Sequence, residues 1–135
     1  MYQFTTPIRV RYAETDQMGI VYYGNYAQYF EVGRVETIRS LGMSYKGLED
    51  MGVMLPVVEM NIKYLRPAQY DDILNIQSTI KELPQKHIIE FHQEIFNESG
   101  KLITSGKVLL YFLDKETRKR VDIPNELKDR LAVYF

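Results

Sequence analysis

Among the residues able to do chemistry, Asp16 has the most suggestive surroundings. It lies in YAETDQMGIVYYGNY (12–26), among small, apolar and aromatic residues, where a strand pattern ends and a helical pattern begins. The start of a helix presents free backbone N–H groups and a partial positive charge. Such an end binds phosphates, carboxylates or the negative oxygen that develops during acyl transfer. Gly19 and Gly24 would let the backbone approach a ligand closely, and Asp16 could fold back to face the same point.

Local sequence alone favours a simpler interpretation of the same residues. An aspartate in a loop before a helix is most often a turn or cap residue. Asn25, with Gln28 three residues later, forms a passable capping pair. For Asn25, a capping role and a ligand contact both stay open, and they are compatible.

The other titratable candidates are fewer. Glu31 and Arg34 have the spacing of a helical ion pair. His87 and His92 are the two histidines, and we interpret both as structural because neither has partners at ligand or triad spacing. The chain has no cysteine, which excludes disulfides, thiolate metal sites and a cysteine nucleophile. We expect no metal site.

The helix that follows this stretch is predicted from Tyr26 to Leu41. Its outer side is expected to carry Gln28, Glu31, Arg34 and Arg39, and Val32, Val35 and Ile38 widen the apolar side until other structure should wrap the helix. Gly42 ends it, and a short second helix is expected over 44–51. The buried stripe at spacings of three and four consists of Tyr26, Tyr29, Phe30, Gly33, Thr37 and Leu41.

Strand patterns surround the helices. Residues 4–12 alternate in polarity, and Pro7 predicts an edge strand. Residues 53–114 read as successive strands joined by short turns, of which KLITSGKVLLYFLD (101–114) is the most apolar and is expected to be the most central. Pro124 could open a short C-terminal helix. The prediction is one α+β domain over 1–135, with a mostly antiparallel sheet of about five strands holding the long helix against its concave face.

Composition narrows the possible partners. The 135 residues carry 17 basic and 18 acidic side chains, a net charge of -1, which offers no general field for nucleic acid or an anionic membrane. No apolar run approaches the length of a membrane span, and the N-terminal residues do not resemble a signal peptide, so we expect a cytoplasmic protein. One helix cannot cover the whole predicted sheet. The remaining apolar surface and open edges predict an oligomer, at least a dimer with strands continuing across the interface.

The stretch from Tyr12 to Arg34 resembles a family signature. The string Y-x-E-T-D-x-M-G-I-V-Y-Y-x-N-Y (12–26), followed by YFE (29–31) and Arg34, looks like that of the hot-dog acyl-CoA thioesterases of the 4-hydroxybenzoyl-CoA thioesterase type. It is closest to the branch of small bacterial thioesterases associated with the Tol-Pal system. IKYLRPAQYDD (62–72) resembles the second block of that family, and the order of elements matches over nearly the whole chain.

The resemblance implies a hot-dog fold and a mechanism. It implies that Asp16 is catalytic, as nucleophile or as base towards water, and that the Tyr23 backbone N–H holds the thioester carbonyl. In the Tol-Pal branch a histidine often occupies the position of Tyr23. Because the donor is a backbone N–H, it is present with either side chain. The difference between histidine and tyrosine therefore bears on substrate preference rather than on catalysis. Some hot-dog enzymes use a helix glutamate as the catalytic acid, which makes Glu31 a reserve candidate.

The resemblance also implies a substrate and its contacts. Acyl-CoA is expected as the substrate, with no metal or redox cofactor, and the protein is expected to be a homodimer or a homotetramer. Lys86 and Arg118 are expected at the CoA phosphates, although a solvated surface explains them more simply. Tyr22, Gly24 and Asn25 are expected to contact the substrate at the helix entrance.

Three alternatives stay open. The substrate could be an acyl-carrier-protein thioester. The protein could also be a non-catalytic acyl-thioester binding module, because a helix end binds an oxygen equally well in an enzyme and in a binding module. The dehydratase branch of the fold typically uses an active-site histidine. It is disfavoured because residues 12–34 contain none.

Overall fold

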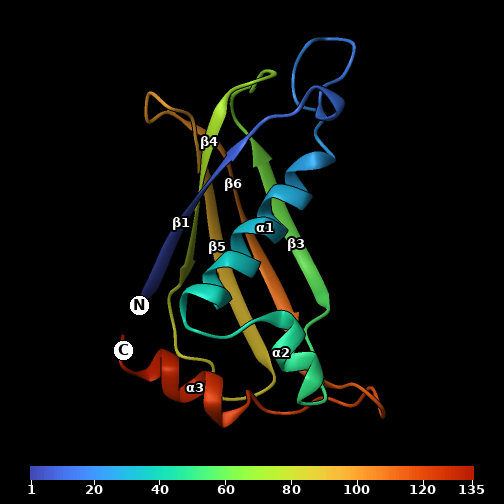
Figure 1. Ribbon diagram of the computed structural model, residues 1–135, viewed down its shortest axis with the longest axis vertical. Coiled ribbons are helices and arrows are strands. Elements are labelled where there is room, and N and C mark those ends of the chain that lie inside the picture. The colour runs from blue at the N-terminus through green and yellow to red at the C-terminus, as the bar shows by residue number, and fades with distance from the viewer.

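The computed structural model describes residues 1–135 and contains one main sheet with a long helix across it (Figure 1). The sheet has five strands in the order β1-β4-β5-β6-β3, and every neighbouring pair is antiparallel. These strands are β1 (Tyr2–Arg9), β3 (Val57–Tyr64), β4 (Ile73–Ile80), β5 (Ile88–Phe96) and β6 (Leu102–Tyr111). A small second sheet pairs β2 (Val53–Met54) with β7 (Leu113–Asp114). The α+β prediction is confirmed.

The helices are close to those expected from the sequence. The long helix α1 spans Asn25–Ser40, α2 spans Tyr45–Asp50 and α3 spans Asn125–Ala132, while η1 (Tyr12–Glu14) is one turn of 3-10 helix. None of them is long and apolar enough to cross a membrane. Gly42 follows α1 with a φ of +84°, the left-handed conformation that ends many helices.

The core lies between α1 and the sheet. All six residues of the predicted stripe are buried, including Phe30 and Thr37, which are fully inaccessible. The helix can approach this closely because Gly33 has no side chain. A Cβ at that position would lie 2.6 Å from Cγ2 of Ile76 and 2.8 Å from Oγ of Ser78. The helix chiefly contacts β1, β4 and β5, while β3 forms an edge of the sheet.

Arg34 differs from its prediction. It was expected on the outer side of α1, paired with Glu31, but its side chain is buried and Nη1 donates to Oε1 of Gln93 at 3.1 Å. Gln93 in turn donates to the carbonyl of Phe30 at 2.8 Å. Burial lowers the pKa of Arg34. The prediction failed because β5 places a polar side chain under the helix, which single-helix periodicity does not reveal.

Two further expectations need correction. The strand expected to be most central, β6, lies inside the sheet, but β5 occupies the middle. The helix was also expected to be wrapped on most sides, yet Val32 is 41% exposed on its outer side. By contrast β1, with Pro7, is an edge strand as predicted.

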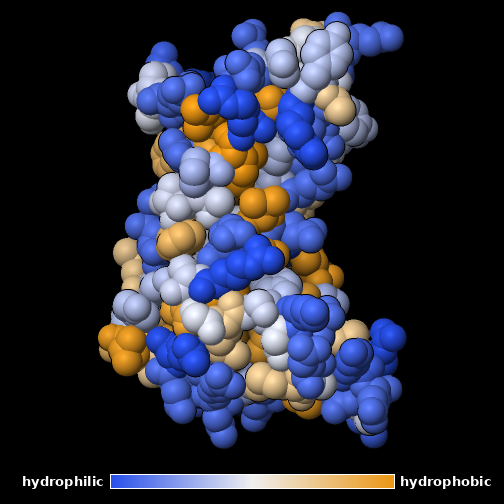
Figure 2. Space-filling view, viewed as in Figure 1, coloured by the Kyte–Doolittle hydropathy of each residue, from blue (hydrophilic) through white to orange (hydrophobic).

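The second edge of the sheet, β3, is unusually apolar for an exposed strand. Val57, Val58, Tyr64 and the following Leu65 are each between 44% and 51% exposed. Figure 2 shows hydrophobic patches among the polar residues on the face that carries α1. An open edge with exposed apolar side chains is a surface suited to pairing with another strand.

Candidate active site

The loop that carries Asp16 is held at its base and closed by a tight turn. Thr15 pairs with Val21 across it, and the N–H of Asp16 donates to the carbonyl of Ile20 at 2.9 Å. The turn ends at Gly19, whose φ of +78° confirms the need for glycine there. Val21 is also tied to the segment before β4, because its N–H donates to the carbonyl of Ala68 at 2.8 Å.

The two carboxylate oxygens of Asp16 have different surroundings. Oδ1 accepts a hydrogen bond from the N–H of Met18 at 2.8 Å, so the residue does form the turn that local sequence suggested. Oδ2 makes no hydrogen bond within the chain. The side chain is half-buried. The turn role and a chemical role are therefore compatible, because the turn orients one oxygen and leaves the other free.

The start of α1 is open. The residue at its N-cap is Gly24, which has no side chain to cap the helix, and the N–H groups of Tyr23 and Gly24 make no hydrogen bond within the chain. Asn25 does not form the predicted capping pair. Its Nδ2 donates instead to the carbonyl of Glu14 at 2.9 Å. Free N–H groups at a helix start favour a negatively charged or polarised oxygen.

Asp16 and Tyr23 line the same hollow, of about 320 Å³, which we call the Asp16 hollow. Its walls come from three segments far apart in sequence. These are the loop (Asp16, Met18, Ile20, Val21), the entrance of α1 (Tyr23, Tyr26), and the end of β3 with the turn after it (Tyr64, Leu65, Arg66, Pro67). The lining is mostly apolar, as expected for a pocket that takes an acyl group.

Tyrosine rings form one side of the hollow. Tyr23 lies edge-on to Tyr64 with ring centroids 6.0 Å apart, and Tyr26 lies 5.6 Å from Tyr64. Burial raises the pKa of Tyr26, so its phenol stays neutral. The ring of Tyr22 is tilted against that of Tyr23, with centroids 4.7 Å apart, but Tyr22 lies outside the lining.

The residues contributed by 64–67 were missed by sequence reasoning. They belong to IKYLRPAQYDD, the second block that resembled the family. The block was matched as a motif but was not assigned to the site. The only feature of the sequence that could have indicated residues 64–67 was their place in this block. Nothing in the sequence shows that the end of an edge strand comes beside the helix entrance.

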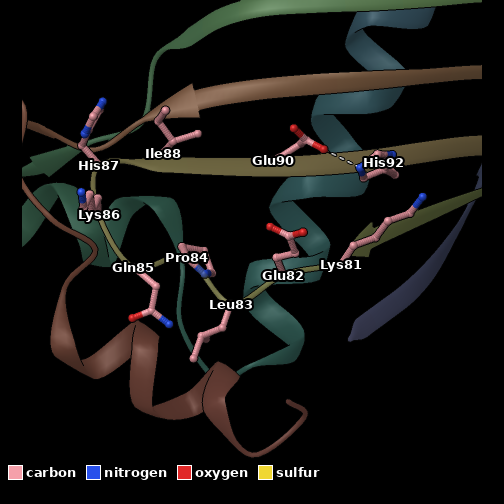
Figure 3. A pocket seen from close by; sticks show the side chains of 10 residues that line it. All are labelled: Lys81, Glu82, Leu83, Pro84, Gln85, Lys86, His87, Ile88, Glu90 and His92. Carbon is pink, nitrogen blue, oxygen red and sulfur yellow. Dashed lines mark hydrogen bonds and ion pairs between the residues drawn. The ribbon is translucent and has the colours of Figure 1, made fainter.

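Lys86 and Arg118 lie away from Asp16 within one chain. The segment between β4 and β5, which carries Lys86, runs beside α3 at the end of the sheet opposite to the loop before α1 (Figure 1). There the carbonyl of Lys86 accepts from the N–H of Ile123 at 2.8 Å. Lys86 and Lys81 stand at opposite ends of a second hollow of about 520 Å³, with Glu82 between them (Figure 3).

Arg118 occupies a tight turn directly after β7. Its φ is +62°, and its N–H donates to the carbonyl of Asp114 at 2.9 Å. Hydrogen bonds from the N–H groups of Thr117 and Glu116 lower the pKa of Asp114, which keeps this carboxylate charged and the turn closed. The turn therefore presents Arg118 from an ordered backbone at the same end of the molecule as Lys86.

The remaining candidates lie outside the Asp16 hollow. Glu31 is exposed on α1. Nε2 of His92 lies 2.5 Å from Oε1 of Glu90 on the sheet, and both belong to the rim of the second hollow. No group of three or more His, Asp or Glu side chains is arranged to hold a metal ion.

Comparison with known proteins identifies the family of the chain. The Thioesterase-like superfamily matches residues 10–131, which span both the loop and the second block. The chain belongs to this superfamily. The resemblance seen in the motif is thereby confirmed.

The similarity to individual relatives extends over nearly the whole length of the chain. The chain is 38% identical to the putative acyl-CoA thioesterase YneP of Bacillus subtilis, over 94% of this chain and 91% of that protein. It is 32% identical to the acyl-CoA thioester hydrolase YbgC of Escherichia coli, over 92% of each chain. The solved structure of a DHNA-CoA thioesterase from Staphylococcus aureus superimposes with a TM-score of 0.90 at 34% identity, covering 99% of this chain and 89% of that one. These likenesses confirm the hot-dog fold and the thioester hydrolase class.

Proposed function

We propose that the protein hydrolyses the thioester of an acyl-CoA to the free acid and CoA, with Asp16 as the reacting carboxylate and the Tyr23 N–H polarising the carbonyl. One observation carries this proposal. Asp16, which has a carboxylate oxygen without a hydrogen bond, and Tyr23, which has an unpaired N–H, line the same apolar hollow at the start of α1. The relatives named as acyl-CoA thioesterases support the choice of substrate.

The chemistry follows from these two groups. In one route, Oδ2 of Asp16 attacks the carbonyl carbon, the C–S bond breaks, and CoA leaves as a thiolate, giving a mixed anhydride. Water then hydrolyses the anhydride and restores the carboxylate. In the other, Asp16 takes a proton from the water that attacks the carbonyl carbon. Negative charge develops on the carbonyl oxygen in both routes, and one well-placed N–H donor is typically worth about 3 kcal/mol there.

The other helix-entrance residues have supporting roles in this proposal. Gly24 offers a second free N–H beside that of Tyr23. Tyr22 extends the aromatic surface beyond the hollow, where the pantetheine arm would pass. The side chain of Asn25 donates to the carbonyl of Glu14. We therefore propose that Asn25 holds the loop against the helix and does not contact the substrate directly. The reaction as proposed needs water but no further cofactor, and we place it in the cytoplasm with its CoA substrate.

A two-fold dimer through β3 would complete the site. Pairing β3 antiparallel to its symmetry copy would bring the Tyr64 end of one strand beside the Val57 end of the other. Arg118 belongs to that second end, because β7 pairs with β2, which precedes Val57 by a few residues. The Arg118 turn of the second copy would then approach the mouth of the Asp16 hollow, where the CoA phosphates would lie. A homotetramer would be a pair of such dimers.

The decisive experiment measures thiol release from a panel of acyl-CoAs, short, long and aromatic, and from an acyl-carrier-protein thioester. The chain has no cysteine, so a thiol-reactive dye meets no background. Asp16→Asn keeps the oxygen that accepts from Met18 and should fold, while kcat falls by about 1000-fold or more, as expected when a reacting group is removed. Asp71→Asn is the matched control, because Asp71 is exposed and lies outside the hollow.

The outcomes separate the alternatives. Turnover of acyl-CoA that is lost with Asp16→Asn supports the proposal, whereas equal rates in both proteins would remove Asp16 and direct attention to Glu31. Turnover of the carrier-protein ester alone would change the substrate. Binding of acyl-CoA without thiol release from any ester would identify a binding module.

The proposed phosphate contact is tested with Arg118→Ala. An exposed ion pair is worth up to about 1 kcal/mol, so KM for acyl-CoA should rise about fivefold with kcat unchanged. A matching N-acetylcysteamine thioester, which has no phosphate, should show no change. An equal effect on both substrates would place Arg118 elsewhere. Sedimentation of the protein would show independently whether it is a dimer or a tetramer.

A further inference from the structure

Glu14 is a buried carboxylate that the proposed reaction does not use. It lies two residues before Asp16 and is 8% exposed. Its Oε1 accepts from the N–H of Arg11 at 2.7 Å and from the hydroxyl of Tyr29 at 3.0 Å, and its Oε2 accepts from Nη2 of Arg11 at 3.2 Å. The carboxylate is thus fixed to Arg11, just after β1, on one side and to the second turn of α1 on the other.

The backbone of Glu14 makes a second set of contacts. Its carbonyl oxygen accepts from the N–H of Tyr22 at 2.9 Å and from Nδ2 of Asn25 at 2.9 Å. Tyr22 directly precedes the residue proposed to hold the carbonyl, and Asn25 begins α1. Glu14 therefore joins the loop to the helix entrance through both its side chain and its main chain.

We propose that Glu14 is a positioning residue that fixes the distance between the carboxylate of Asp16 and the N–H of Tyr23. The inference rests on the proposed function, because that distance matters only if both groups act on one carbonyl. Neither group is anchored to the other directly. Asp16 hydrogen-bonds within its own turn, and the Tyr23 N–H is free.

Burial makes this role more specific than ordinary packing. A carboxylate taken out of water is costly unless it is fully hydrogen-bonded, and an apolar side chain would fill the space at lower cost. Arg11 is 77% exposed at its side chain, so its charge is largely screened by solvent. The more protected partner is Tyr29, and burial followed by the Glu14 contact raises the pKa of Tyr29 far above its ordinary value. The hydrogen bonds of the Glu14 carboxylate therefore serve to orient it, and its ion pair with Arg11 contributes little.

The test compares Glu14→Ala with the conservative Glu14→Gln. Glutamine keeps an acceptor oxygen for the Arg11 N–H and the Tyr29 hydroxyl, so its kcat should stay within about threefold of wild type. A displacement of about 1 Å can cost about 100-fold in rate, so Glu14→Ala should lower kcat by about 10- to 100-fold with KM within about threefold. Arg130→Ala is the matched control. Its Nη1 donates to the carbonyl of Leu41 at 3.0 Å, at the other end of α1.

Amide hydrogen exchange provides a readout independent of turnover. In Glu14→Ala the N–H groups of Met18 and Tyr22 should exchange at least about tenfold faster, because opening of the loop exposes both. In Glu14→Gln and Arg130→Ala they should exchange as in wild type. If the wild-type protein were inactive on every ester, the proposed function would be overturned. Amide exchange would still test whether Glu14 holds the loop against the helix entrance.

Two results would overturn the positioning role. One is Glu14→Ala with unchanged exchange at Met18 and Tyr22. The other is a loss of kcat in Arg130→Ala equal to that in Glu14→Ala at equal loss of stability, because the effect would then be general destabilisation.

Discussion

The two ends of α1 are treated in opposite ways. At the C-terminal end, the N–H of Gly42 donates to the carbonyl of Arg39 at 2.9 Å, and Arg130 reaches from α3 to the carbonyl of Leu41. At the N-terminal end, Gly24 provides no cap and the N–H groups of Tyr23 and Gly24 have no partner in the chain. One end is closed by the chain itself, and the other is left open.

The difference shows where the helix serves stability and where it serves the site. Unsatisfied groups at a helix end usually find a side-chain or backbone partner. Tyr23, at the open end, lines an apolar hollow that Asp16 also lines. A ligand oxygen can take the place of the missing cap, and the partial positive charge of the helix strengthens that contact.

Placing a negative charge at the open end should disturb the site more than any change at the closed end. Gly24→Asp puts a carboxylate beside the free N–H groups. It should raise the free energy of unfolding by about 0.3–1 kcal/mol through the helix dipole. It should lower kcat by about 10- to 100-fold, because the carboxylate competes with the developing oxyanion. Thiol release and urea unfolding measure the two effects.

Gly24→Ala is the control for that change. Any Cβ at position 24 comes within 2.8 Å of the ring of Tyr22, which is exposed and can turn away. The alanine variant should therefore keep most of its activity. A loss as large as that of the aspartate variant would show that the side chain, and not the charge, disturbs the site.

At the closed end, Gly42→Ala should affect stability and leave kcat unchanged. The φ of +84° is unfavourable for alanine by about 1–2 kcal/mol, and the new Cβ would lie 2.6 Å from Nη1 of Arg130. Urea unfolding should show a loss of this size. If kcat fell in parallel with that of Gly24→Asp, the two ends would not be functionally distinct.

The smallest effect is expected from Tyr29→Phe at alkaline pH. Burial and the Glu14 contact raise the pKa of Tyr29, so its stabilising contribution is fully present below the ordinary tyrosine pKa of 10.0 and is lost as pH rises from there towards the folded value. Phenylalanine removes this loss. Unfolding free energies measured between about pH 9 and pH 11 should decline less steeply in the variant. An identical slope would mean that Tyr29 titrates normally in the folded protein.

Much of this arrangement could be predicted from the sequence. Periodicity predicted α1 to within one residue at each end and its buried stripe, Pro7 marked an edge strand, and the motif around Asp16 led to the superfamily. These features are local, and each depends on residues within a few positions of one another.

Features that depend on distant segments could not be predicted. The burial of Arg34 depends on Gln93 in β5, and the wall formed by Tyr64 depends on where an edge strand ends. Asn25 looked like a cap because Gln28 follows it, but the carbonyl of Glu14 is a partner that only the folded loop provides. The separation of Lys86 from the Asp16 hollow follows from the antiparallel pairing of β1 with β4, which ends β4 beside Tyr2 rather than beside Arg9.

NMR of the bound substrate tests directly whether the open end of α1 holds the thioester carbonyl. Asp16→Asn labelled with ¹⁵N would be saturated with an acyl-CoA carrying ¹³C at the thioester carbonyl. We expect the amide proton of Tyr23 to move downfield on binding and the carbonyl carbon to move downfield with it. An unchanged amide signal for both Tyr23 and Gly24 at saturation would contradict the account.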